Sequence, residues 1–145
     1  MRLRNIPGAD DVIKRHPIAV KESKDYKGKW NTLFENDNPI HVEIGMGKGQ
    51  FILNLAKRNP DINYIGIERY SSVLLRALEK YDTEEFCELT NVRFICMDAM
   101  ELPDVFDVEE VGKMLREKLG AKGGGRGTMV QGMVSAMKSK IEEVL

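Results

Sequence analysis

The fold is decided by one stretch of sequence, His41-Val42-Glu43-Ile44-Gly45-Met46-Gly47-Lys48-Gly49-Gln50. The apolar residues at its start predict a short buried strand over residues 40–44, and the glycines that follow predict a turn into a helix. Three glycines at alternate positions let the backbone approach a ligand without a Cβ in the way. The unpaired N–H groups that open the helix suit a carboxylate or phosphate. The stretch therefore predicts a ligand-binding loop.

The acid in this stretch indicates which ligand the loop binds. Glu43 stands two residues before Gly45. A pyrophosphate would gain nothing from a carboxylate there, whereas an ammonium or sulfonium group would be attracted to it. The glycines also lack the G-x-G-x-x-G spacing of dinucleotide-binding loops. Both observations disfavour a dinucleotide-dependent oxidoreductase and favour a loop for S-adenosylmethionine.

The residues after the loop predict an α/β fold with three parallel strands and helices. A helix is expected over residues 50–58, with Phe51, Ile52, Leu55 and Ala56 packed on the sheet. A second strand over 62–68 completes a βαβ unit. A helix over 71–81, a short helix over 82–89 and a third strand over 92–97 continue the pattern.

Two acids are predicted to lie beside the loop. Glu68 ends the second strand 19 residues after Gly49, where nucleotide-binding folds place an acid for the ribose hydroxyls. Asp98 and Ala99 follow the third strand, and an aspartate there can accept from the exocyclic amine of adenine. The carboxyl ends of parallel strands meet at one edge, so we expect a single site. A strand-end acid taken alone is more often a surface residue.

Composition narrows the class of protein. Hydrophobic residues make up 42% and charged residues 31% of the 145 residues, as in a folded globular domain. No apolar run approaches the roughly 18 residues of a membrane span, and none follows Arg2 and Arg4 as in a secretory signal. Cys87 and Cys96 are expected to be reduced in a cytoplasmic protein, with Cys96 a small apolar strand residue. The histidines and cysteines lack the spacing of a metal site.

Charge is unevenly distributed along the chain. Residues 1–30 hold eight basic against four acidic residues, a net charge of +4, and residues 68–110 carry a net charge of −8. We expect residues 1–39 to form an irregular basic arm, in which lysines and arginines mix with Tyr26 and Trp30. Such a mixture suits phosphate contacts and base stacking. The alternative is an arm that Trp30 anchors to the core.

With these residues the chain resembles the tRNA guanine-N7 methyltransferases, class I enzymes that use S-adenosylmethionine. The resemblance covers residues 1–111. Its matching pieces are Arg2-Leu3-Arg4, Trp30, Val42-Glu43-Ile44-Gly45-Met46-Gly47-Lys48-Gly49, Tyr64-Ile65-Gly66-Ile67-Glu68 and Met97-Asp98-Ala99. It implies the N-terminal half of a Rossmann-like methyltransferase fold, with the cofactor-binding half at residues 40–111.

The resemblance also implies residue roles. Glu43 would face the methionine part of the cofactor, Glu68 would hold the ribose and Asp98 the adenine. The implied cofactor-binding residues are Glu43, Gly45, Gly47, Gly49, Glu68, Asp98 and Ala99, and the implied tRNA-binding residues are Arg2, Arg4, Lys27 and Lys29. Guanine N7 already carries an in-plane lone pair, so orientation supplies much of the rate and neither a catalytic base nor a metal is assigned.

The family pattern ends near residue 111. An Asp-Pro-Trp-Pro-Lys-type string that follows a fourth strand in the family is absent, and Trp30 is the only tryptophan. Residues 112–145 predict a tail of helix, glycine loop and helix, in which Met114, Leu115 and Leu119 form an apolar stripe. The tail's Gly123-Gly124-Gly125-Arg126 loop and following helix resemble the C-terminal end of the alanyl-tRNA synthetase and editing-protein domain.

We therefore expect a junction at residues 111–112 and an exposed edge on the first strand. The tail, a second copy or a partner chain would cover that edge. The resulting expectation is a tRNA (guanine-N7)-methyltransferase with an intact cofactor half and little activity. The alternative is a non-enzymatic protein that binds tRNA or another RNA.

Overall fold

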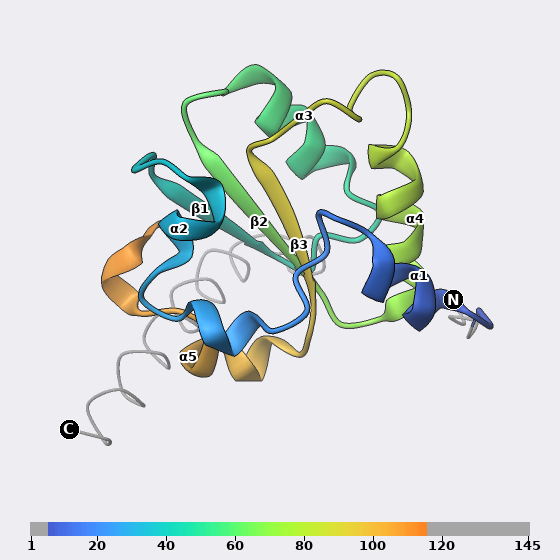
Figure 1. Cartoon of the computed structure of the whole chain (residues 1–145), viewed down its shortest axis with the longest axis horizontal. Helices are drawn as coiled ribbons and strands as arrows, with labels where there is room; N and C mark the ends of the chain where they lie inside the picture. The colour runs from blue at the N-terminus through green and yellow to red at the C-terminus, as the bar shows by residue number, and fades with distance from the viewer. Residues whose placement is uncertain (1–5, 116–145) are drawn as a thin grey trace, which may run out of the picture.

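The predicted strand–turn–helix unit is confirmed in the computed structural model, which describes residues 6–115. Strand β1 spans Ile40–Ile44, helix α3 spans Gln50–Arg58 and strand β2 spans Asn63–Glu68. The two strands pair in parallel, with Val42 opposite Ile65. Helix α3 connects them across one face of the sheet (Figure 1).

The next predicted helix and strand are also confirmed. Helix α4 spans Ser71–Tyr81, and strand β3 spans Val92–Cys96 and pairs in parallel with β2. The short helix expected over residues 82–89 is wrong, because this segment forms consecutive turns. In these turns both Phe86 N and Cys87 N donate to Thr83 O, at 3.1 and 2.9 Å.

A fourth strand, β4, spans Val111–Leu115 and runs across the boundary predicted at residues 111–112. It pairs in parallel with β1, which gives the sheet order β3-β2-β1-β4. The helix predicted from the stripe that includes Leu115 is therefore wrong for residues 112–115. A short apolar run suits either structure, and the free edge of β1 selects the strand. The first residues of the predicted tail thus cover the edge of β1, as a strand and not as a helix. Leu119 and the glycine loop lie outside the described residues.

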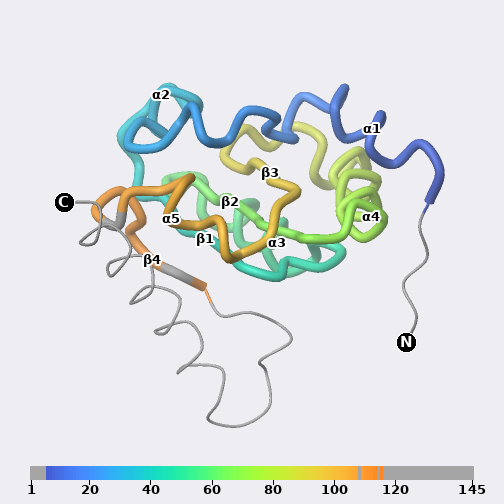
Figure 2. Tube along the Cα trace, turned by 90° about the horizontal axis from the view of Figure 1, so that it is seen from below, coloured from blue at the N-terminus to red at the C-terminus, as the bar shows by residue number. Residues whose placement is uncertain are grey.

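The N-terminal segment is more regular than predicted. It contains helix α1 at Ala9–Arg15, a 3₁₀ turn η1 at Ser23–Tyr26 and helix α2 at Trp30–Phe34. Between α1 and η1 the chain extends the sheet, since Phe94 N donates to Ile18 O at 2.9 Å and Val20 N donates to Phe94 O at 2.8 Å. Figure 2 shows this segment running along one side of the sheet from α1 to α2.

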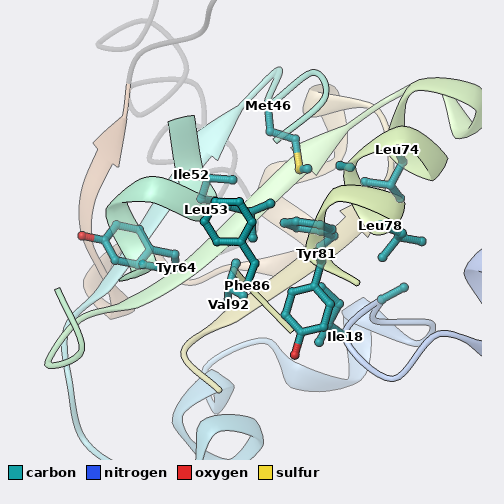
Figure 3. Close-up of a cluster of buried hydrophobic side chains, with 14 of the residues drawn as sticks. Ile18, Met46, Ile52, Leu53, Tyr64, Leu74, Leu78, Tyr81, Phe86 and Val92 are labelled. Carbon is teal, nitrogen blue, oxygen red and sulfur yellow. The ribbon is translucent and has the colours of Figure 1, made fainter. Parts of the chain in front are cut away.

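Apolar side chains fill both faces of the sheet. Under α1, α3 and α4 they form a cluster that includes Met46, Ile52, Leu74 and Phe86 (Figure 3). The opposite cluster lies under α2 and helix α5, which spans Leu102–Val105. The 3₁₀ turns η2 at Ala99–Glu101 and η3 at Val108–Glu110 flank α5.

Trp30 anchors the N-terminal segment to the second cluster, as one of the two sequence readings predicted. Its side chain is fully buried, and Nε1 donates to Val105 O at 2.8 Å. The indole ring stacks on Phe106 with ring centroids 5.1 Å apart. The arm is therefore part of the folded unit from Ile6 onward, and its exposed lysines are held on a rigid support.

Two side chains predicted as apolar packing residues are exposed. Phe51 is exposed because α3 turns Ile52, Leu53 and Ala56 toward the sheet. Cys96, the last residue of β3, is also exposed, with Sγ 3.7 Å from Arg69 O. Among residues 6–115, no helix has the length and apolar character needed to cross a bilayer.

Candidate cofactor site

The glycine turn is fixed against the end of β2. Gly45, Gly47 and Gly49 adopt φ values of 71°, 60° and 84°, a region that side-chain-bearing residues rarely occupy. Gly45 N and Met46 N both donate to Ile67 O, at 2.9 and 3.0 Å. The turn therefore sits at the carboxyl edge of the sheet, which we define as the edge where β1, β2 and β3 end.

The glycines of the turn serve different purposes. A Cβ added to Gly47 would meet no atom within 4 Å, so this part of the turn presents open backbone. A Cβ added to Gly49 would lie 3.1 Å from the Cβ of Ala77, so Gly49 allows α3 to pack closely on α4. The geometry makes Gly47 the better candidate for ligand contact, and the cofactor roles of all three glycines stay predictions.

Gly66 leaves the space that Met46 of the glycine turn occupies against the sheet. This role was not predicted from the sequence. Gly66 lies in the middle of β2, where an added Cβ would collide with Met46 Sδ. Met46 is fully buried between the turn and the sheet. The signal was present in the sequence, because a glycine inside a strand often marks a close approach by another group.

Glu68 joins the end of β2 to the glycine turn. Its Oε1 accepts a hydrogen bond from Gly47 N at 3.0 Å, and its Oε2 accepts one from Tyr70 N at 3.1 Å. The side chain is largely buried, yet a carboxylate has about four acceptor sites. The carboxylate can therefore hold the turn and still accept from a ligand hydroxyl.

Asp98 lies at the same edge, after β3. Its Oδ1 accepts from Met100 N at 2.9 Å and caps η2, whose first residue is Ala99. Its Oδ2 lies 3.7 Å from Nε of Arg69, and Met97 N donates to Glu68 O at 3.2 Å. The structure thus brings Asp98 and Ala99 to the strand end next to Glu68.

Glu43 differs from the other acids, because its side chain is fully buried. It lies opposite Gly66 in the β1–β2 register, one residue from the end of β1. Its carboxylate belongs to the interior of the sheet rather than to the surface of the edge. The predicted contact with the methionine part of a cofactor stays a prediction.

Two of the four predicted tRNA-binding residues, Lys27 and Lys29, lie at the other edge of the sheet, where β1 begins. Lys27 and Lys29 are exposed on a turn whose Gly28 N donates to Glu110 Oε2 at 2.7 Å, immediately before β4 begins. Val111 pairs with Ile40, the first residue of β1, so the length of β1, about 15 Å, separates this turn from the glycine turn. Arg2 and Arg4 lie outside the described residues.

The titratable groups at the site show no cluster suited to a metal ion. Among residues 6–115, no group of three histidine, cysteine, aspartate or glutamate side chains is placed to bind one. Partial desolvation raises the pKa of the Cys96 thiol, and the nearby Asp10 and Glu68 carboxylates raise it further. Cys96 is therefore held as a thiol rather than as a nucleophilic thiolate.

Comparison with known proteins agrees with this arrangement. A family model described as a putative methyltransferase matches residues 37–115, which extends past the predicted junction to the end of β4. The tRNA (guanine-N(7)-)-methyltransferase of Lachnoclostridium phytofermentans is 54% identical to this chain over 114 residues. The protein of the same name from Bacillus subtilis is 51% identical over 115 residues.

These alignments cover 79% of this chain and 52% and 53% of the two relatives. The chain therefore spans about half the length of the curated relatives that it matches. Among solved structures, a SAM-dependent methyltransferase from Geobacter sulfurreducens in complex with S-adenosyl-L-homocysteine is 18% identical, with a TM-score of 0.47. That alignment covers 92% of this chain and 51% of the other.

Proposed function

We propose that this chain is the cofactor-binding half of a tRNA (guanine-N7)-methyltransferase. The chain belongs to the putative methyltransferase family, whose model matches residues 37–115. Its cofactor is S-adenosylmethionine, bound at the carboxyl edge of the sheet. The observation that carries the proposal is the hydrogen bond from Gly47 N to Glu68 Oε1, at 3.0 Å. It joins the two parts of the sequence that were predicted separately as a cofactor loop and a ribose-binding acid.

The described residues fit this cofactor. The open backbone at Gly47 leaves room for a ligand against the turn, and the first N–H groups of α3 suit its carboxylate. Glu68 keeps acceptor sites for the ribose hydroxyls. Asp98, partly exposed at the next strand end, keeps acceptor sites for an adenine amine beside its contacts with Met100 N and Arg69.

The rate of methyl transfer depends on the orientation of the reacting atoms and not on a strong base. When bound, S-adenosylmethionine supplies an electrophilic methyl group, which the in-plane lone pair of guanine N7 can attack. The protein must hold the two reacting atoms in line, about 3 Å apart. This positioning raises the rate because a bimolecular step becomes an effectively unimolecular one. Glu68 and the glycine turn fix one side of that geometry. None of the described residues is assigned a catalytic role.

Calorimetry with S-adenosylhomocysteine and the full 145-residue chain tests the cofactor site. We expect binding by the wild type and at least about tenfold weaker binding by E68Q, because hydrogen bonds to a charged acceptor are lost. The matched control is E79Q, since Glu79 is an exposed acid on α4 that pairs with Arg76. Equal affinities in E68Q and E79Q would reject the site.

A radiolabelled-methyl assay on tRNA tests turnover. We expect little or no transfer by this chain, since it spans about half the length of its curated relatives. Robust transfer would show that the chain carries its own guanine-binding residues.

A second candidate function is RNA binding without methyl transfer. It is supported by the exposed Lys27 and Lys29 on a turn anchored to the core. A gel shift with tRNA at two salt concentrations measures it, because phosphate contacts weaken as salt rises. A shift at low salt, together with no heat from S-adenosylhomocysteine, would favour this function over the methyltransferase.

A further inference from the structure

The two exposed lysines lie on one well-defined turn at the amino edge of the sheet, which we define as the edge where β1 begins. Lys29 N donates to Tyr26 O at 2.8 Å, which closes a four-residue turn. Lys27 has φ −56° and ψ 125°, and Gly28 has φ 78°. These are the dihedral angles of a type II turn, in which the third position favours glycine. The backbone therefore places Lys27 and Lys29 on either side of Gly28.

One carboxylate holds this turn in place. Glu110 Oε2 accepts from Gly28 N at 2.7 Å, and Glu110 Oε1 accepts from Trp30 N at 3.2 Å. The same Oε2 accepts from Asp107 N at 2.9 Å. Gly28 and Glu110 are 82 residues apart in the sequence, so the carboxylate connects two distant segments.

Close packing around Gly28 and Trp30 also restricts the position of the turn. A Cβ added at Gly28 would lie 2.7 Å from Asp107 Oδ2. Trp30, the next residue but one, is fully buried against Phe106. The turn is thus held by hydrogen bonds and by packing, and its two lysines are exposed.

The lysine charges are available to a partner. Neither Lys27 nor Lys29 forms an ion pair with another described residue, whereas Lys24 lies 3.7 Å from Glu101. The negative charge that fixes the turn is directed at backbone N–H groups. Because the backbone of the turn is already ordered, the two lysines can meet phosphates without the ordering cost of a flexible loop.

We infer that Glu110 is a positioning residue for RNA binding, which holds the Tyr26–Lys29 turn so that Lys27 and Lys29 contact phosphates together. This inference rests on the proposed tRNA function and adds a residue that contacts no RNA itself. It assigns to the amino edge of the sheet a binding role that is separate from the cofactor edge.

The first test is amide hydrogen exchange in the full chain. In E110Q an NH₂ group replaces one acceptor oxygen and faces backbone donors, so exchange at Gly28 and Trp30 should rise by at least about tenfold. The matched control is E109Q, because Glu109 is the exposed neighbour and loses the same charge. If E110Q does not fold, E110D is the substitute variant, because it keeps the charge on a shorter side chain.

The second test is affinity for an unmodified tRNA transcript. Relative to E109Q at the same salt, E110Q should bind about three- to tenfold more weakly, because the lysines lose their fixed placement. In a K27Q/K29Q chain, the slope of log affinity against log salt concentration should be smaller by about 1.4 to 1.8, because two phosphate contacts are lost. Adding E110Q to that chain should weaken tRNA binding no further.

The outcomes separate this inference from the proposed function. Equal tRNA affinities of E110Q and E109Q would overturn the role of Glu110 while tRNA binding stands. The same holds if E110Q weakens tRNA binding as much in the K27Q/K29Q chain as in the wild-type chain. Absence of wild-type binding to the transcript at low salt would reject tRNA binding and this inference together. Binding of S-adenosylhomocysteine, at the other edge of the sheet, reports separately whether each variant is folded.

Discussion

The carboxylate of Glu68 accepts a hydrogen bond from Gly47 N at 3.0 Å, and through it the end of β2 holds the turn that follows β1. The second oxygen accepts from Tyr70 N at 3.1 Å. The side chain proposed to bind the ribose therefore also holds the glycine turn in place. A substitution at Glu68 is expected to change the protein before any cofactor binds.

Amide exchange at Gly47 should reveal this second role. E68Q removes the charge of the carboxylate and replaces one of its two acceptor oxygens by NH₂, so without added ligand we expect Gly47 exchange to accelerate by about tenfold or more. E79Q, which alters an exposed acid of α4, should leave the rate at Gly47 unchanged. Equal Gly47 exchange in the two variants would mean that the turn holds its shape without Glu68.

Gly66→Ala should destabilise the fold, because its new Cβ would collide with Met46 Sδ inside the core. Overpacking of this kind costs about 1–3 kcal/mol in the free energy of unfolding, measured by urea denaturation. Gly112→Ala is the control, since its Cβ would lie at an ordinary 3.5 Å from Ile40 O. A G66A chain as stable as G112A would show that Met46 can move aside.

Trp30→Ala should be among the most destabilising substitutions in the N-terminal segment. It removes a fully buried indole and its 2.8 Å hydrogen bond to Val105 O, for an expected loss of about 3–5 kcal/mol. Circular dichroism is the suitable probe, because Trp30 is the only tryptophan. Phe51→Ala, at an exposed site on α3, should cost far less. A small loss in W30A would contradict the anchoring role.

His41 should make stability depend on pH. Burial lowers the pKa of its imidazole from the ordinary 6.5, and the charge of Lys113 lowers it further. The unfolded chain then binds this proton more readily than the folded chain. Stability is undiminished above 6.5 and falls as the pH decreases from there to the lowered pKa of the folded state.

Denaturation at about pH 7.5 and about pH 5.5 tests this prediction, because the two values bracket the ordinary histidine pKa. The H41Q variant should lose less stability between them than the wild type. Lys113→Gln should also reduce the loss, because it removes the repulsion. An unchanged pH dependence in H41Q would assign the effect to other groups.

The sequence by itself determined the order of elements from β1 to β3 and the positions of the candidate site. The alternating apolar residues, the glycines and the strand-end acids act over a few residues, so they can be read without knowing what packs against them. Glu68 and Asp98 could be assigned to one edge because parallel strands end together. The resemblance to methyltransferases rested on the same local strings.

Only the tertiary structure decided the remaining features, because each depends on a partner far away in the sequence. The run at Val111–Leu115 became a strand because β1 offered a free edge. Glu43 proved to be buried, and the lysines at positions 27 and 29 were placed at the amino edge by Glu110. Hydrogen bonds across 21 residues, as between Gly47 and Glu68, leave no periodic trace in a sequence, so they appear only when the chain is folded.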